Sequence, residues 1–201
     1  MRVKVTQNGA SRDKQNMNKI GLFFGTDSGT TRLIAKKIAR KLGNEIASKP
    51  LNINRIGIDD FLSYHSMILG TPTYGEGILP GISSGIEAGS WEEFLPQLAE
   101  HDLSGKTIAL YGLGDQEKYA PFFVDALYEL YLPLKNCGAN IIGDWSIDGY
   151  DFEASKAILN DRFVGLAIDH HIQNTLTDSR LDAWLEFVSP KLQAHIEQQL
   201  N

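Results

Sequence analysis

A short loop of small and hydroxyl-bearing residues, Gly25–Thr31, separates an apolar run from an amphipathic helical pattern. The apolar run, Ile20–Phe24, is typical of a buried strand. Apolar residues then recur at helical spacing from Leu33 to Leu42, with basic residues between them. A small, polar loop at the start of a helix presents unpaired backbone N–H groups, and these favour a phosphate. The order strand, loop, helix therefore predicts a phosphate site on an α/β scaffold.

The loop matches neither of two common nucleotide-binding patterns. It has no Gly-Lys-Ser/Thr sequence, so it offers no lysine to a nucleoside triphosphate, and the GxGxxG spacing of dinucleotide sites is absent. What remains is a cradle of hydroxyls and amides suited to one terminal monophosphate. Taken alone, the loop is equally compatible with a capped strand–turn–helix that binds nothing.

Apolar runs and helical patterns alternate along the 201 residues, a length that suits one domain. Strands are expected near residues 20–25, 46–53, 66–71, 106–113, 139–143 and 163–168. Helices are expected near 30–42, 58–63, 92–99, 121–136 and 178–199. The pattern predicts a doubly wound parallel sheet with helices on both faces. Ligands bind such sheets beyond the carboxyl ends of the strands, where loops 25–31, 71–90 and 112–120 are expected to meet.

Charge is distributed unevenly along the chain. Residues 1–19 carry a net charge of +4, and because the whole chain carries −6, the remainder carries −10. An acidic body disfavours nucleic acid and favours docking onto basic protein surfaces. Residues 1–18 are polar and are expected to form a disordered extension ahead of a domain over residues 19–201. With no secretory signal and no membrane-spanning run, a cytoplasmic protein is expected. A monomer is expected as well.

Two tyrosines are expected at the same edge of the sheet. Tyr74 follows the third strand and Tyr119 follows the fourth, and together they could enclose a planar heteroaromatic ring. Each tyrosine alone is more often an ordinary half-buried loop residue. Combined with a monophosphate cradle, the pair makes flavin mononucleotide, FMN, the leading candidate ligand.

At these motifs the chain resembles a long-chain flavodoxin. The first loop matches the family pattern T-x-[ST]-G-x-T, and the later loops match in Thr71–Thr73 and in Gly112–Gln116 with Tyr119. Residues 143–169 resemble the insertion that splits the last of five strands in long-chain members. The likeness extends from about Lys19 to the C-terminus. It implies a flavodoxin-like fold and a low-potential one-electron carrier that shuttles FMN between semiquinone and hydroquinone.

The resemblance also implies which residues hold the cofactor. The first loop would bind the phosphate, Thr73 and Asp148 would lie near the phosphate or ribityl chain, and the two tyrosines would stack on the flavin. Backbone groups of Leu113–Asp115 would bond the pyrimidine edge, and the Gly75–Glu76 peptide would turn toward N5. The implied cofactor-binding set is Thr26, Asp27, Ser28, Gly29, Thr30, Thr31, Pro72, Thr73, Tyr74, Gly75, Gly112, Leu113, Gly114, Asp115, Tyr119 and Asp148.

Acidic residues near the expected flavin, Glu76, Asp115 and Asp148, would disfavour an anionic reduced flavin and lower its potential. Lys118 places one positive charge in this rim. The lengthened loop 76–90 is similar to that of flavodoxins that serve nitrogen fixation, and it is expected either to select the redox partner or to be an idle insertion. Expected partners are a reductase as donor and a nitrogenase reductase or a radical enzyme as acceptor.

Two other functions remain open from the residues. One is an FMN-dependent quinone or azo reductase on the same fold, and the other is a binding module without cofactor. The adjacent histidines His170 and His171 could suggest a metal, but neighbouring histidines in a loop rarely converge, so no metal site is expected. No catalytic residue is expected, and Cys137 is expected to be a packing residue.

Overall fold

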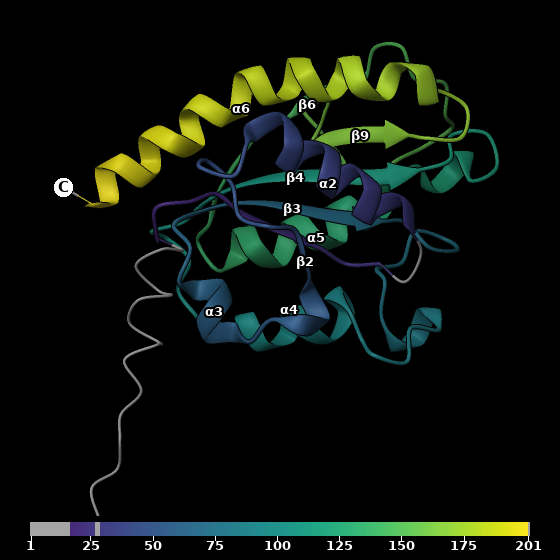
Figure 1. The fold of residues 1–201 in the computed structure, drawn as a ribbon. Helices are drawn as coiled ribbons and strands as arrows, with labels where there is room; N and C mark the ends of the chain where they lie inside the picture. Colours follow the sequence, from purple (N-terminus) through teal and green to yellow (C-terminus); the bar gives the residue numbers. More distant parts are fainter. Residues whose placement is uncertain (1–16, 27–28, 201) are drawn as a thin grey trace, which may run out of the picture.

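A parallel sheet forms the centre of the structure, a computed structural model that describes residues 17–26 and 29–200. The strand order is β2-β1-β3-β4-β5 (Figure 1). The extension expected over residues 1–18 lies almost wholly outside the described residues, as do Asp27 and Ser28 of the predicted phosphate loop. The main strands are β1 (Gly21–Phe24), β2 (Leu51–Asn52), β3 (Ser66–Pro72), β4 (Thr107–Gly114) and β5 (Asn140–Ile142).

The last strand position is shared by two segments, as expected for a split strand. The first half of β4 pairs with β5, and its second half, Tyr111–Gly114, pairs with β9 (Leu166–Asp169). The chain between β5 and β9 carries a small antiparallel sheet of order β6-β8-β7. Its strands are β6 (Trp145–Ser146), β7 (Ile158–Leu159) and β8 (Arg162–Phe163). The predicted flavodoxin-like α/β architecture is therefore confirmed.

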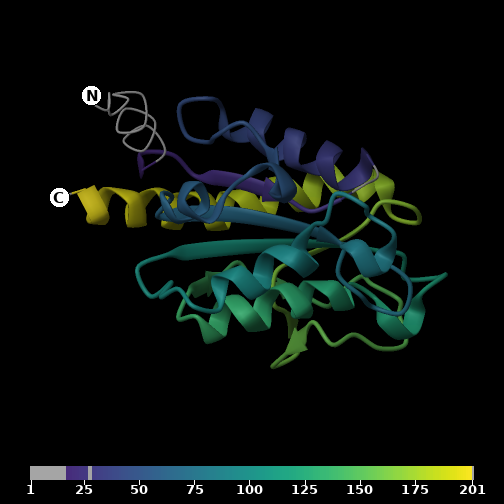
Figure 2. The same ribbon diagram turned by 90° about the horizontal axis from the view of Figure 1, so that it is seen from below.

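Helices cover both faces of the sheet (Figures 1 and 2). On one face lie α2 (Gly29–Leu42) and α6 (Thr177–Leu200); on the other lie α3 (Ile58–Leu62), α4 (Trp91–Leu98) and α5 (Asp125–Asn136). Short 3-10 turns span Ile53–Arg55, Ile82–Ser84, Ala120–Phe122 and Asn174–Leu176. No helix of the described chain combines the length and apolar composition that crossing a membrane requires.

The central strands are mostly apolar because each of their faces is covered. Leu22 and Ile68 pack beneath α2 and α6, whereas Phe23 and Leu69 pack against the opposite helices. Neighbouring residues of a strand point to opposite faces, so both must be apolar when both faces are buried. Edge strand β2 is shorter than the expected 46–53, because Pro50 precedes it and cannot donate a ladder hydrogen bond.

Candidate cofactor site

A cavity of about 410 Å³ opens at the carboxyl edge of the sheet. Its volume lies in the range of roughly 300–1,000 Å³ common for small-molecule sites. Segments from the start of α2, the ends of β3 and β4, and the turn after β9 meet around it. The lining residues are Thr30, Thr31, Pro72, Thr73, Tyr74, Leu113, Gly114, Asp115, Lys118, Tyr119, His170 and His171.

Two threonine hydroxyls in this lining stand without a hydrogen-bond partner among the described residues. They are Oγ1 of Thr31, in the first turn of α2, and Oγ1 of Thr73, just after β3. A buried hydroxyl without a partner costs roughly 1–3 kcal/mol, so such groups in native proteins usually serve a ligand or an ordered water. Both hydroxyls border one cavity at a helix N-terminus, and they fit a ligand that ends in a phosphate.

Tyr74 begins a tight turn at the mouth of the cavity. Its N–H donates to the carbonyl of Ile78 at 3.1 Å, and the Ile78 N–H donates back to Tyr74 at 2.9 Å. Gly75 adopts φ +47° and Gly77 φ +91°, the left-handed conformations that close the turn. A Cβ on Gly75 would meet nothing within 4 Å. The Gly75–Glu76 peptide therefore lies in a turn closed by the hydrogen bonds of Ile78 and Gly77 to Tyr74, with open space around Gly75.

The loop after β4 is folded around Asp115. The Asp115 carboxylate accepts the backbone N–H of Glu117 at 3.2 Å and that of Lys118 at 2.8 Å, and the Tyr119 N–H donates to the Asp115 carbonyl at 3.0 Å. The Lys118 ammonium lies 5.1 Å from the centre of the Tyr119 ring. The loop thus presents an aromatic ring, one carboxylate and one ammonium to the same opening.

A buried carboxylate, Asp169, holds the loop after β4 against the turn after β9. Asp169 is 1% exposed and accepts the backbone N–H of Gln116 at 3.0 Å and those of His171 and Ile172 at 2.9 Å. The Gln116 side chain in turn accepts the N–H of Asp151, in the insertion, at 2.6 Å. Three loops that are distant in sequence are thereby joined beneath the cavity.

Tyr150 fastens the insertion to the same region. Its hydroxyl donates to the carbonyl of Ala167 in β9 at 2.6 Å, and the guanidinium of Arg180 lies 3.9 Å from its ring centre. Burial raises the pKa of Tyr150 to about 12. The phenol is therefore a neutral donor at physiological pH, and it ties the insertion to the strand that ends at Asp169.

Some predicted site residues lie outside this cavity. Thr26 and Gly29 line a neighbouring cavity of about 650 Å³, together with Arg32 and Arg55. That cavity lacks both tyrosines and both unpartnered threonine hydroxyls, so it is the poorer match to a flavin nucleotide. Thr30 and Thr31, by contrast, line the first cavity. Gly112 is buried within β4, where a Cβ would come within 2.9 Å of the side chain of Leu127, so it shapes the strand rather than the lining.

Asp148 does not line the cavity either. It is exposed and accepts the hydroxyl of Ser146 at 2.7 Å. His170 and His171 occupy the cavity wall instead, together with Lys118. The position of the two histidines follows from the pairing of β9 with β4, which no local sequence pattern reveals. Within the described chain, no group of three or more side chains is arranged to hold a metal ion.

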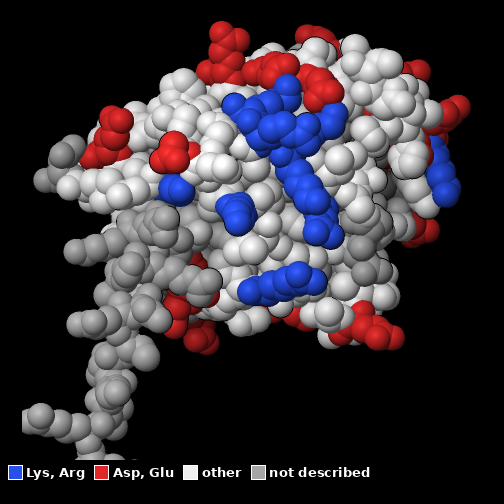
Figure 3. Space-filling view, viewed as in Figure 1, with Lys and Arg blue, Asp and Glu red and all other residues white. Residues whose placement is uncertain are grey.

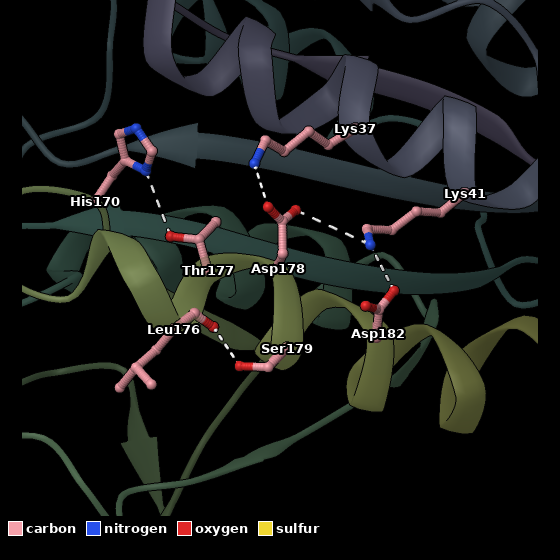
Figure 4. A network of polar contacts seen from close by, with 8 residues as sticks. All are labelled: Lys37, Lys41, His170, Leu176, Thr177, Asp178, Ser179 and Asp182. Atoms are coloured by element: carbon pink, nitrogen blue, oxygen red, sulfur yellow. Dashed lines mark hydrogen bonds and ion pairs between the residues drawn. The ribbon is translucent and has the colours of Figure 1, made fainter.

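The surface charge is not uniformly acidic. Lysines and arginines gather over α2, whose basic residues are Arg32, Lys36, Lys37, Arg40 and Lys41 (Figure 3). Lys37 pairs with Asp178 at 2.7 Å and Lys41 with Asp182 at 2.6 Å, both on α6 (Figure 4). The expected acidic body thus carries a basic face on the side of α2.

Comparison with known proteins gives a consistent result. The family model described as Flavodoxin matches residues 22–184. A flavodoxin of Klebsiella pneumoniae is 51% identical over 170 residues, covering 85% of this chain and 96% of its own. Flavodoxin 1 of Escherichia coli K12 is 41% identical, covering 90% and 97%. The structure of Fusobacterium nucleatum flavodoxin bound to flavin mononucleotide superposes with a TM-score of 0.77 at 31% identity, covering 87% and 98%.

Proposed function

The chain belongs to the flavodoxin family, and from this premise we propose that the cavity between Tyr74 and Tyr119 holds FMN without a covalent bond. Members of this family carry electrons rather than catalyse a reaction on a substrate. Bound FMN supplies the one-electron chemistry, and the protein supplies binding, orientation and electrostatics. The chain is accordingly an FMN-dependent electron-transfer protein.

We propose that the phosphate is bound at the start of α2. Thr30 and Thr31 bring backbone N–H groups and hydroxyls to this helix terminus, and the Thr73 hydroxyl adds a further donor. The two buried hydroxyls without a described partner are the single observation that carries this assignment. Asp27 and Ser28 remain part of the proposal by resemblance, whereas Asp148, which lies outside the cavity, does not.

We propose that Tyr74 and Tyr119 enclose the isoalloxazine ring and keep water from its faces. The backbone of Leu113, Gly114 and Asp115 would bond the pyrimidine edge. Gly75 would let its peptide turn, since its φ of +47° and the open space around it permit a change of conformation that a side chain would hinder.

We further propose that loop 76–90 contacts the redox partner. The loop is fastened to the start of α4, because Glu93 accepts the N–H of Ile82 and Glu92 that of Ser83, each at 2.9 Å. Ile78 and Ile82 are 43% and 62% exposed on this fastened loop. Exposed apolar side chains on a loop that is hydrogen-bonded in place, next to the Tyr74 turn, suit the small, weak interfaces of electron-transfer complexes.

The partners themselves are part of the same proposal. A pyridine-nucleotide-linked reductase would be the donor, and a nitrogenase reductase or a radical enzyme would be the acceptor. We place donor, monomeric carrier and acceptor together in the cytoplasm. The basic α2 face and the acidic remainder would orient the carrier in these encounters, so transfer rates should depend on ionic strength.

Reconstitution tests the proposed function directly. Protein incubated with FMN and then dialysed should be yellow, with absorbance near roughly 450 nm as for any oxidised flavin. It should take electrons from a reductase one at a time and should not oxidise NAD(P)H by itself. A colourless dialysed protein would refute the FMN site, and direct NAD(P)H oxidation with quinone as acceptor would favour a quinone reductase.

A further inference from the structure

The turn after β9 places two histidines on the wall of the cavity. Strands β9 and β4 are parallel, and Asp169 is in register with Gly114. The next residues, His170 and Asp115, therefore leave the sheet at neighbouring points of its carboxyl edge. His170 and His171 both line the cavity. Their imidazoles thus share the opening with the two tyrosines.

The backbone that carries these rings is held in place. The buried Asp169 carboxylate accepts the N–H of His171 and that of Ile172, both at 2.9 Å. The Nδ1 atom of His170 lies 3.4 Å from the hydroxyl of Thr177, which is 1% exposed at the start of α6 (Figure 4). The His170 ring is therefore held by a side-chain contact, whereas His171 is held through its backbone.

Charged groups of both signs lie around the rings. From the loop after β4, Asp115 and Lys118 both line the cavity. On the side of α6, Asp178 pairs with Lys37 of α2 at 2.7 Å (Figure 4). Arg180 of α6 is turned toward the insertion, where it donates to the carbonyl of Gly149 at 3.2 Å.

One further charged group lies beneath the turn. Asp169 directs its oxygens to three backbone N–H groups. Among the described residues that line the cavity, Lys118, His170 and His171 are the basic side chains.

We propose that His170 and His171 face the bound cofactor and make its affinity and its reduction potential depend on pH. The inference rests on the proposed FMN site. An imidazolium beside the cavity attracts the phosphate and the added electron, whereas a neutral imidazole does not. Protonated rings would therefore make FMN bind more tightly and its reduction easier than neutral rings would.

The test compares the native protein with the double variant His170→Asn/His171→Asn. FMN dissociation constants are measured by quenching of flavin fluorescence between about pH 5.5 and pH 8, the range in which imidazoles change charge. The phosphate of free FMN also titrates near this range, but free FMN is the same in both measurements, so its titration cancels in the ratio of the two dissociation constants. His195→Asn, which alters a half-buried histidine near the far end of α6, is the control.

The ratio of the variant's dissociation constant to the native one should rise about fivefold to tenfold from pH 8 to pH 5.5. The His195→Asn ratio should stay constant. Potentiometry should show that, as the pH falls over the same interval, the reduction potential of the native protein rises above that of the double variant. Parallel pH profiles of native protein and double variant would overturn the inference.

Two further results separate the inference from its premise and from misfolding. If neither protein binds FMN at any pH, the proposed function fails. Parallel pH profiles of two proteins that both bind FMN would instead overturn only the role of the histidines. If the double variant does not fold by circular dichroism, the single variant His171→Asn, at an exposed position, is measured instead. It should retain about half of the effect on a logarithmic scale, and a profile identical to the native one would overturn the role of His171.

Discussion

The carboxylate of Asp169 accepts the backbone N–H of Gln116 at 3.0 Å, which joins the end of β9 to the loop after β4. The same carboxylate holds the turn that carries His170 and His171. One buried side chain therefore sets the relative position of two walls of the cavity proposed to hold FMN.

Asp169→Asn should loosen both walls. An amide nitrogen cannot accept the N–H groups that one carboxylate oxygen now accepts, so we expect a stability loss of about 1–3 kcal/mol and roughly tenfold weaker FMN binding. Urea unfolding and fluorescence titration measure the two effects. Asp151→Asn is the control, because the Gln116 side chain accepts the backbone N–H of Asp151, which the substitution leaves in place. Equal behaviour of the two variants would contradict the role of Asp169.

Thr31→Val and Thr73→Val should separate stability from affinity. Each substitution removes a buried hydroxyl without a described partner, so the protein without FMN should be as stable as before or slightly more stable. FMN affinity should fall about tenfold or more, because a hydrogen bond to a charged group is lost. In the control Thr71→Val, a hydroxyl that donates to the Pro72 carbonyl at 3.0 Å is removed, so stability should fall while affinity holds. Unchanged FMN affinity in both variants would place the phosphate elsewhere.

Gly25→Ala should destabilise the start of the phosphate loop. A Cβ at Gly25 would lie 2.3 Å from Cδ1 of Trp91 and 2.5 Å from Oγ of Ser90. The Trp91 indole cannot easily move, because it is fully buried and donates to the Gly70 carbonyl at 2.9 Å. We expect a loss of about 1–3 kcal/mol by thermal or urea unfolding. Gly29→Ala, where a Cβ meets nothing within 4 Å, should leave stability nearly unchanged.

Asp178→Asn should weaken the contact between α2 and α6 in a pH-dependent way. The hydrogen bond from Lys37 lowers the pKa of Asp178. A lowered folded-state pKa means that the pair stabilises the fold fully above the unfolded pKa of about 3.9 and loses this effect as the pH falls through the folded pKa. At pH 7 the variant should lose about 0.5 kcal/mol, since the pair is exposed. Below the folded pKa the native protein and the variant should be equally stable. Glu186→Gln on the same helix should show no such difference.

Ile82→Ser should slow electron transfer without affecting the cofactor. Ile82 is 62% exposed on the fastened loop 76–90, so a partner that covers it would lose an apolar contact. We expect electron transfer from a pyridine-nucleotide-linked reductase to be about threefold to tenfold slower when the flavodoxin concentration is limiting. The affinity for FMN should be unchanged. Leu159→Ser, 40% exposed in the insertion, is the control. Identical rates for both variants would show that loop 76–90 is not a contact.

Much of the fold follows from local patterns. The continuous apolar runs of β3 and β4 required a sheet covered on both sides, and the helical spacing after Thr31 required an amphipathic helix. The expected split of the last strand rested on resemblance, and the pairing of β4 with both β5 and β9 confirms it. The short extent of β2 followed from Pro50 rather than from the apolar pattern.

The α/β class and the three loops at the carboxyl edge can be read from the chain alone, because strand and helix periodicity and loop composition are local properties. Long-range packing places His170 and His171, and not Asp148, in the lining of the cavity beside Tyr119. It also decided that Asp169 binds Gln116, 53 residues away. Such contacts depend on the register between β4 and β9, which long-range packing sets and no local pattern encodes.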